Sequence, residues 1–372
     1  GVQNPKSPIQ NRQSKIPPLM RILHILKHVR NSGNGTTNVA VDLACLQAKA
    51  GYEVAVASEG GDYEPLLASY GVKHFTLDQH KKLPILLRLA GHYRTIVQQF
   101  QPDIVHAHMM IGMVLAWACR SGFPYKLVST VHSEFQRNAI LMGLADRVIA
   151  ISTAVAQAME RRGIPARKLR LVFNGTLDSP RTRSLQDYDP MPLQRPAITT
   201  VAGMWKRKGI AELIDAFAQI APDFPQAHLY LVGHGEVEPF KLKASETGVS
   251  DRIHFEGFQP EPQRYLLATD IFVLASHREP FGLLLSEARE AGCAIVASNV
   301  DGIPEALDGG KAGVLVPPID SGALAIELAK LLRDASTLNH WRDRAQQNLT
   351  WLSAERVSQE TLAIYQEFVK KG

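Results

Sequence analysis

Short apolar runs alternate with longer amphipathic segments along almost the whole chain. An apolar run at Arg21–His28 precedes a glycine-containing turn, a helical pattern over about residues 37–50 that ends at Gly51, and a second apolar run at Glu53–Ser58. A strand, a helix and a further strand in this order form the βαβ unit of a parallel sheet. The pattern therefore predicts an α/β protein with a doubly wound parallel sheet.

The alternation continues in two series. In the first, the further predicted elements are helices near 84–100 and 111–121 and strands at Lys73–Thr76, Ile104–Ala107, Lys126–Thr130, Arg147–Ile151 and Leu169–Val172. In the second, they are helices near 210–220, 283–291, 322–332 and 354–371 and strands at Ala197–Val201, Ala227–Val232, Ile253–Glu256, Ile271–Ala275, Ala294–Ser298 and Gly313–Val316. We expect two Rossmann-like domains that face a cleft, with ligands at the carboxyl ends of the strands.

The segment between the two series, 177–195, is rich in proline and lacks periodicity, which indicates a linker. We therefore expect an N-terminal domain over 19–176 and a C-terminal domain over 196–353. Residues 1–18 have little apolar content and predict a disordered leader.

The composition is that of an ordinary globular protein. Of 372 residues, 45% are hydrophobic and 21% charged, which excludes collagen-like, disulfide-rich and wholly disordered classes. The cysteines, Cys45, Cys119 and Cys293, are too widely separated for a disulfide framework or a zinc site. No apolar run reaches the roughly 20 residues of a membrane helix, and the first residues lack the plan of a signal peptide. These features predict a cytoplasmic protein.

The formal net charge of +5 is divided unevenly. Residues 1–180 carry 21 Lys and Arg against 11 Asp and Glu, a net of +10, whereas residues 181–372 carry 20 against 25, a net of −5. The basic first half suggests an anionic partner, and a chance accumulation of solvated cations is the alternative.

The segment Ile271–Ala291, IFVLASHREPFGLLLSEAREA, is the most informative part of the chain. A buried strand runs into a loop and then into a helix near Leu283, so the unpaired N–H groups at the helix start point into the cleft and suit a phosphate. Glu279 and Glu287 are placed to accept hydrogen bonds from hydroxyls at the two ends of a nucleotide sugar. The alternative makes Glu279 a helix cap and Glu287 a solvated surface residue.

A basic loop follows the predicted strand at Ala197–Val201. Its sequence, MWKRKG, supplies three cations that can neutralise a departing diphosphate, namely Lys206, Arg207 and Lys208. A solvated charge run in a loop is the alternative interpretation.

Taken with its neighbours, EPFGLLLSEA resembles the E-x7-E motif of family-4 retaining glycosyltransferases (glycosyl transferases group 1), which have the GT-B fold. Other segments that follow the order of that family are Gly33-Asn34-Gly35, Val131-His132, Asn174-Gly175, Lys208-Gly209, Leu231-Val232-Gly233-His234-Gly235 and Gly302-Ile303-Pro304-Glu305. The resemblance covers roughly residues 20–370. It implies that the C-terminal domain holds a nucleotide diphosphate sugar and the N-terminal domain presents the acceptor. The final helix, about 354–372, is expected to cross back to the N-terminal domain.

The resemblance also implies roles for single residues. Glu279 would hold hydroxyls of the donor sugar and Glu287 the ribose, while His132, which by itself could be structural, would lie near the donor sugar. The further donor-binding positions are Phe281, Gly282, Leu283, Leu284, Gly33, Gly35 and Gly233.

One position departs from the family. Lys208 matches the lysine that faces the diphosphate, but Gly203 stands where the family usually has an arginine. Arg207 or Lys206 would have to replace that arginine from a shifted position.

Two motifs that resemble metal sites are interpreted otherwise. His106 and His108 would share one face of an extended segment, but no carboxylate or third histidine is close in the sequence, so a structural role is favoured. Asp187-Tyr188-Asp189 is a formal DxD motif, yet it lies in the linker after no strand. We expect no metal and no cofactor besides the nucleotide sugar, which is a co-substrate.

These inferences predict a retaining, metal-independent hexosyltransferase that uses a UDP- or GDP-sugar and a glycan or lipid-linked acceptor, in the biosynthesis of cell-surface polysaccharide or glycolipid. Because no carboxylate is marked as a nucleophile, we expect same-face attack by the acceptor with electrostatic stabilisation of the diphosphate. The alternatives are a GT-B nucleotide-sugar epimerase or phosphorylase, an NAD-dependent dehydrogenase that uses the Gly33–Gly35 loop, and a periplasmic-type sugar-binding protein. Nucleic acid is not expected as a partner.

The segment His80–Gln99 combines Lys81, Lys82, Arg88 and Arg94 with apolar residues at helical spacing. It suggests either a peripheral helix on the inner face of an anionic membrane or a core-facing helix with a basic outer face.

Overall fold

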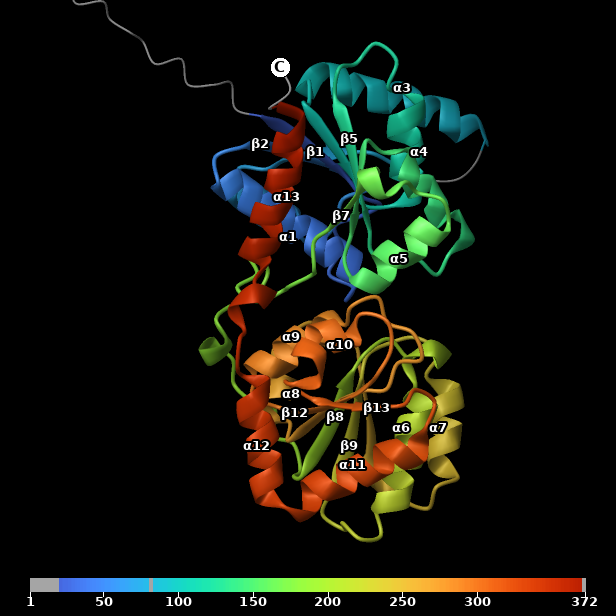
Figure 1. Ribbon diagram of the computed structural model, residues 1–372, viewed down its shortest axis with the longest axis vertical. Helices are drawn as coiled ribbons and strands as arrows, with labels where there is room; N and C mark the ends of the chain where they lie inside the picture. Colours follow the sequence, from blue (N-terminus) through green and yellow to red (C-terminus); the bar gives the residue numbers. More distant parts are fainter. Residues whose placement is uncertain (1–19, 80–82, 370–372) are drawn as a thin grey trace, which may run out of the picture.

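Two parallel sheets organise the chain, of which the computed structural model describes residues 20–79 and 83–369 (Figure 1). The first sheet has the strand order β3-β2-β1-β4-β5-β6-β7 and the second the order β10-β9-β8-β11-β12-β13, with every pair parallel. In both, the order reverses next to the first strand of the sheet, so the carboxyl ends on either side of that point open a crevice for a ligand.

The first domain contains strands β1 Arg21–Ile25, β2 Glu53–Ser58, β3 Lys73–Thr76, β4 Ile104–Ala107, β5 Lys126–Val131, β6 Arg147–Ala150 and β7 Leu169–Leu171. Its helices are α1 Gly35–Lys49, α2 Glu64–Ser69, α3 Leu83–Phe100, α4 Met110–Ala118 and α5 Thr153–Arg161. The second contains strands β8 Ala197–Val201, β9 His228–Val232, β10 Ile253–Gly257, β11 Ile271–Leu274, β12 Ala294–Ser298 and β13 Val314–Val316. Its helices are α6 Ile210–Ile220, α7 Glu238–Ser245, α8 Gln263–Ala268, α9 Leu283–Glu290, α10 Ile303–Ala306, α11 Ser321–Arg333 and α12 Ala335–Ala345, and α13 Ala354–Val369 follows.

Each predicted strand is present, with ends that differ by a few residues. The first strand was expected over Arg21–His28 but ends at Ile25, because the chain then turns and the Val29 N–H donates to the Gly60 carbonyl. The helices without a predicted counterpart are α2, α5, α7, α8, α10 and α12. In α12 only Ala345 is buried, and Leu338 and Trp341 pack against the second-domain core while partly exposed, so the apolar stripe of this helix is short and weak.

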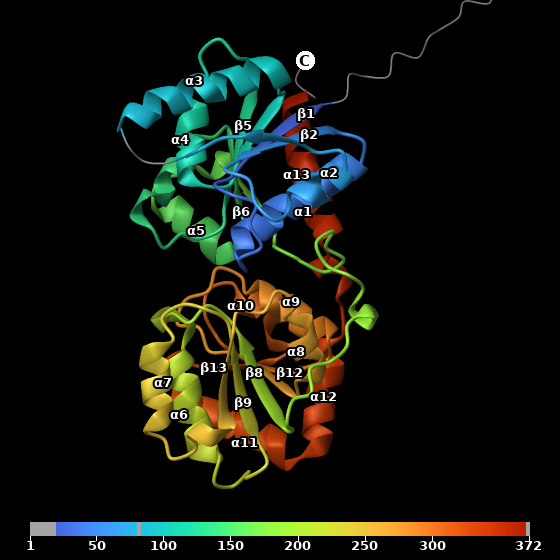
Figure 2. The same ribbon diagram turned by 180° about the vertical axis from the view of Figure 1, so that it is seen from behind.

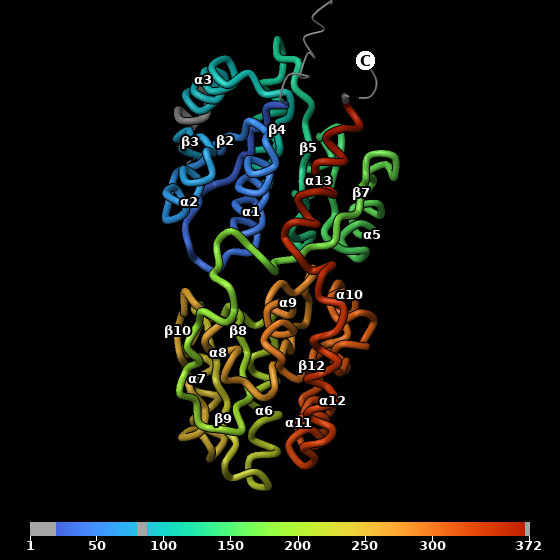
Figure 3. Tube along the Cα trace, turned by 90° about the vertical axis from the view of Figure 1, so that its left-hand side faces the viewer, coloured from blue at the N-terminus to red at the C-terminus, as the bar shows by residue number. Residues whose placement is uncertain are grey.

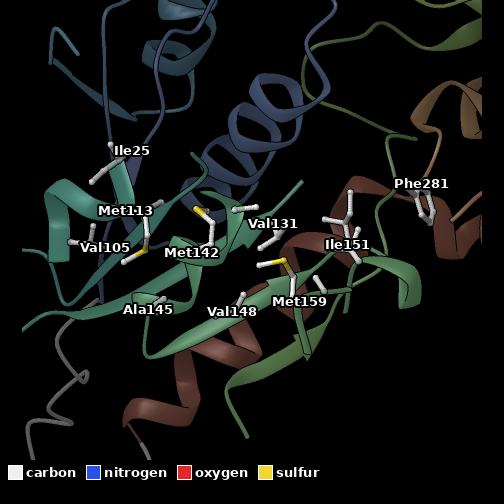
Figure 4. Close-up of a cluster of buried hydrophobic side chains, with 14 of the residues drawn as sticks. Ile25, Val105, Met113, Val131, Met142, Ala145, Val148, Ile151, Met159 and Phe281 are labelled. Atoms are coloured by element: carbon white, nitrogen blue, oxygen red, sulfur yellow. The ribbon is translucent and has the colours of Figure 1, made fainter. Parts of the chain in front are cut away.

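The buried hydrophobic residues form three clusters. In the first domain, one face of the sheet packs against α1 and α13, and the other against α3, α4 and α5. The cluster on the α5 side continues into the second domain through Phe281 and Leu285. Figure 4 shows Met142, Val131, Met159 and Ile151 side by side, with Phe281 beyond Ile151. The two domains therefore share one hydrophobic cluster.

The chain crosses twice between the domains, and the two crossings lie together (Figures 2 and 3). The Leu177 N–H donates to the Leu352 carbonyl, and the Ala354 N–H donates back to the Leu177 carbonyl. Beyond this point α13 packs against α1 of the first domain. The paired crossings thus form the covalent connection between the domains.

None of the helices in the described part of the chain has the length and hydropathy to cross a membrane. The described part of α3 buries Leu89, Tyr93 and Ile96, so it presents an apolar face to the core. Arg94 in the same helix donates to the carbonyls of Cys119 and Ser121. These contacts fit a core-facing helix. Lys81, Lys82 and the leader 1–18 lie outside the described residues.

Candidate functional site

A cavity of about 870 Å³ lies between the domains, where the carboxyl ends of both sheets face each other. Most of the residues singled out from the sequence line it: Gly33, Gly35, His132, Arg207, Lys208, Gly233, Glu279, Phe281, Gly282, Leu283, Leu284 and Glu287. Lys206 does not. Folding thus collects in one cavity residues that lie up to about 250 positions apart in the chain.

The first-domain edge of the cavity is the loop before α1. Asn34 caps this helix, since its side-chain oxygen accepts from the N–H groups of Thr36 and Thr37. A Cβ at Gly35 would lie 2.8 Å from Leu283 Cδ1, and one at Gly33 would lie 3.2 Å from the Phe258 ring. The two glycines therefore allow this loop to approach the second domain closely.

The second-domain edge is the loop between β11 and α9. Gly282 precedes α9 in a left-handed conformation, φ +86°, and no side chain caps the helix. The N–H groups of Leu283 and Leu284 are therefore available at the cavity, where they and the helix dipole suit an anion. Because Glu279 makes no bond to this helix start, it is not the helix cap that the alternative interpretation assumed.

Glu279 is 8% exposed and pairs with Lys208. Its Oε2 accepts from the Lys208 ammonium and from Ser276 Oγ at 3.2 Å, and its backbone N–H donates to Asp301 at 2.8 Å. Its carbonyl accepts from the N–H of Gly302, and this bond joins the loop before α9 to the loop at residues 301–305, DGIPE. Lys208 and Ser276 therefore hold the carboxylate, while Asp301 and Gly302 hold the backbone of Glu279.

The basic loop 204–209 uses its cations in different ways. Lys208 binds Glu279, and the Arg207 guanidinium lies 5.7 Å from the centre of the Phe135 ring across the cavity. Lys206 is exposed outside the cavity lining. Of the three cations expected here, Arg207 and Lys208 line the cavity and Lys206 does not.

Glu287 lies on the cavity side of α9, partly buried, and accepts a hydrogen bond of 3.0 Å from Gln263. Burial raises its pKa to about 7, against the opposing effect of the Arg181 charge. This environment differs from that of a solvated surface residue, which was the alternative.

The linker contributes residues that the sequence analysis missed. Arg181 and Arg183 both line the cavity. Arg181 donates to both oxygens of Asp42 in α1, at 2.8 and 2.9 Å, with both side chains buried, while Arg183 pairs with Glu261 at 2.7 Å. The arginines that follow the last strand of the first domain are a usable signal of this role, whereas the proline-rich composition of the segment indicates only a linker.

The first domain supplies His132 at the end of β5. Its Nε2 lies 3.2 Å from Nδ1 of His108, and His108 in turn lies beside His24 and His106. Because His24 comes from β1 and His132 from β5, the sequence did not show that these histidines meet. Among the described residues, the only group of potential metal ligands is His24, His106 and His108, so Asp187 and Asp189 form no such group.

Comparisons with known proteins cover both halves of the chain. A model described as Glycosyltransferase Family 4 matches residues 33–176, and one described as Glycosyl transferases group 1 matches residues 189–348. The chain is 25% identical over 366 residues to N-acetyl-alpha-D-glucosaminyl L-malate synthase of Bacillus anthracis, with 91% of this chain and 95% of that protein covered. It is 26% identical over 272 residues to D-inositol 3-phosphate glycosyltransferase of Corynebacterium jeikeium, with 62% and 64% covered. Among solved structures, Anabaena HepE in complex with UDP and glucose superposes with a TM-score of 0.79 at 21% identity, over 95% of this chain and 100% of that chain.

Proposed function

Because this chain belongs to glycosyltransferase family 4 and is a glycosyltransferase of the GT-B fold, we propose that it moves a hexose from a nucleotide diphosphate sugar to an acceptor hydroxyl. The observation that carries the proposal is the pairing of Glu279 with Lys208 beside the uncapped start of α9, in a cavity open to both domains. Carboxylate, ammonium and free backbone N–H groups are the partners that sugar hydroxyls and a diphosphate require.

The diphosphate would bind at the start of α9. The N–H groups of Leu283 and Leu284 and the charges of Arg207 and Lys208 would balance the negative charge that develops as the sugar–phosphate bond breaks. Since these groups supply the positive charge, the reaction needs no metal ion in this proposal. HepE, which has the same fold, was solved with UDP-glucose as well as with UDP and glucose, which supports a UDP-sugar as donor.

Given the retention of configuration that the family resemblance implies, the carboxylates around the cavity favour same-face attack over a double displacement. Within the described residues, three line it, and each has a partner: Glu279 binds Lys208, Glu287 binds Gln263 and Glu261 binds Arg183. None is left free as a nucleophile for a double displacement. The acceptor hydroxyl would therefore attack on the face of the leaving diphosphate, which accepts its proton.

The acceptor would bind from the first domain. This half of the chain carries a net charge of +10, which favours an anionic or membrane-borne acceptor in glycolipid or surface polysaccharide synthesis at the inner face of the membrane. Vesicle flotation with anionic lipids at low salt tests the membrane part of this proposal, and the absence of binding would contradict it.

The test of the reaction is turnover of a panel of UDP- and GDP-sugars, with release of the nucleoside diphosphate as the readout. We expect release from one class of donor and a loss of at least about 100-fold in Glu279→Gln, since a carboxylate aimed at the reacting sugar is removed. The control is Glu246→Gln, because Glu246 is an exposed carboxylate of the second domain outside the cavity lining and should keep wild-type turnover.

Two outcomes would contradict the proposal. Wild-type turnover in Glu279→Gln would remove the assigned site. Interconversion of the donor without transfer, or a strict requirement for orthophosphate, would indicate the epimerase or phosphorylase alternative.

A further inference from the structure

Four histidines form a hydrogen-bonded chain directly behind the cavity. His24 in β1 and His106 in β4 are register partners, and His108 and His132 follow the ends of β4 and β5. His24, His106 and His108 are at most 3% exposed, and only His132 lines the cavity. This series of hydrogen-bonded histidines thus extends from the cavity into the core of the first domain.

The contacts run in a fixed order. His132 Nε2 lies 3.2 Å from His108 Nδ1, His108 Nε2 lies 2.9 Å from His24 Nδ1, and His24 Nε2 lies 2.8 Å from Gln47 Oε1. The Gln47 amide nitrogen then donates to the Tyr365 hydroxyl of α13 at 3.5 Å. A second branch joins Tyr365 to His106 Nδ1 at 2.5 Å.

All four rings are uncharged at neutral pH. Burial lowers the pKa of His24 and of His132 to about 4, and lowers those of His106 and His108 well below their usual range. A neutral imidazole carries one N–H, so a ring that donates through one nitrogen must accept through the other. The nitrogen that carries the proton in one ring therefore determines which nitrogen carries it in the next ring.

Gln47 determines the proton positions along the series, because its side-chain carbonyl oxygen can only accept a hydrogen bond from His24. His24 must then donate through Nε2 and accept through Nδ1, so His108 donates through Nε2 and accepts from His132 Nε2. The remaining nitrogen of His132, Nδ1, has no hydrogen-bond partner among the described residues, and it carries the lone pair.

We propose that Gln47, His24 and His108 are positioning residues that hold His132 as a neutral ring with its proton on Nε2 and its Nδ1 lone pair offered to a substrate hydroxyl in the cavity. The substrate part of this inference rests on the proposed function, whereas the state of the ring does not. His132 then orients a hydroxyl by accepting from it and donates nothing to the substrate.

A metal ion is the competing use of the same histidines, since ligand atoms of His24, His106 and His108 lie within 4.8 Å of one another. The hydrogen bonds oppose it. Both ring nitrogens of each of these histidines already have a partner, including Thr130 Oγ1 at 2.7 Å from His106 Nε2. A metal would have to break several of these bonds in a fully buried place.

The test is the tautomer of His132 in the full-length protein without substrate, read from long-range proton–nitrogen NMR spectra after histidine labelling. His132→Gln identifies the signals by their loss. We expect the wild type at pH 7.5 to carry the proton on Nε2. In Gln47→Leu the acceptor that sets the direction is gone, so the form with the proton on Nδ1 becomes populated and kcat falls by about tenfold, as for the loss of one hydrogen bond.

The matched control is Ser129→Ala, which removes a buried hydrogen bond to the Met142 carbonyl on the same sheet but outside the chain. It should leave the His132 tautomer and kcat as in the wild type. A wild-type ring that is protonated on Nδ1 or on both nitrogens, an unchanged tautomer in Gln47→Leu, or stoichiometric metal on the histidines would overturn the inference. If no nucleotide sugar is turned over, the proposed function fails, and the wild-type spectrum still decides which nitrogen of His132 carries the proton.

Discussion

Glu287 shows how strongly position alters an ordinary residue. Its sequence neighbourhood is that of a polar helix position, yet it faces the cavity, and burial raises its pKa to about 7. Glu279, eight positions earlier, is held instead by Lys208 and Ser276. Two carboxylates of one motif therefore have different surroundings, which fits their proposed roles at opposite ends of the donor.

The raised pKa of Glu287 predicts a pH-dependent stability. The folded protein binds this proton more tightly than the unfolded chain does, so the contribution of Glu287 to stability is complete below about pH 4.5 and is lost as the pH rises to about 7. Relative to Glu287→Gln, the wild type should lose roughly 2–3 kcal/mol of unfolding free energy over this interval and nothing further above it. Urea denaturation of both proteins at a series of pH values measures the difference. A difference that stays constant with pH would contradict the prediction.

At the scale of elements, the cavity depends on loops that pack against each other. The His277 N–H donates to the Arg207 carbonyl, and the loop before α9 also bonds to the DGIPE loop. At Gly209, φ is +67°, and a Cβ there would lie 1.8 Å from the Ala275 carbonyl oxygen. The basic loop therefore sits against the end of β11 only because this residue has no side chain.

Gly209→Ala should accordingly destabilise the second domain and displace Lys208 from Glu279. The matched control is Gly309→Ala, because Gly309 has a similar φ of +69° but open space around the site of a Cβ. An alanine in the left-handed conformation lowers the free energy of unfolding of both variants. The clash with Ala275 should lower that of Gly209→Ala by about a further 1–3 kcal/mol. Urea midpoints of the two variants test this. An equal loss of stability in the two variants would show that the close approach of Gly209 to Ala275 does not require a glycine.

At the scale of the whole molecule, the domains are joined at the cavity by polar contacts as well as by the shared hydrophobic cluster. Arg278 pairs with Glu134 of the first domain at 3.1 Å and with Asp301 of its own domain. Glu305 in α10 accepts from the Thr153 N–H at the start of α5, with both carboxylate oxygens within 3.2 Å. These contacts join the two domains beside the cavity.

Replacing Glu305 with alanine should loosen this arrangement. The Thr153 amide loses a charged hydrogen bond, so its exchange with solvent deuterium should accelerate by about tenfold or more. The radius of gyration from small-angle scattering should increase as open forms become populated. Glu327→Ala, which alters a carboxylate on α11 paired only within its own helix, is the control and should change neither quantity. Unchanged exchange at Thr153 would show that Glu305 does not join the domains.

The sequence by itself determined the elements and the local motifs. The strands were recognisable because an apolar run bounded by turn residues carries its own signal, and the start of α9 because EPFGLLLSEA places a strand, a loop and a helix next to each other. It missed α12, in which only Ala345 is buried and the apolar stripe that Leu338 and Trp341 form with it is short. It also placed Lys206 with the two cations that line the cavity, because spacing in a short loop does not give the direction of a side chain.

Only the tertiary structure decided which distant residues meet. His24 and His132 lie 108 positions apart and are joined through His108 by the order of β1, β4 and β5 in the sheet. Arg181 belongs to the cavity because the linker folds back against Asp42 of α1. The physical reason is that helices and strands follow from short-range patterns, whereas burial, partners and protonation depend on the packing of segments that the sequence does not place side by side.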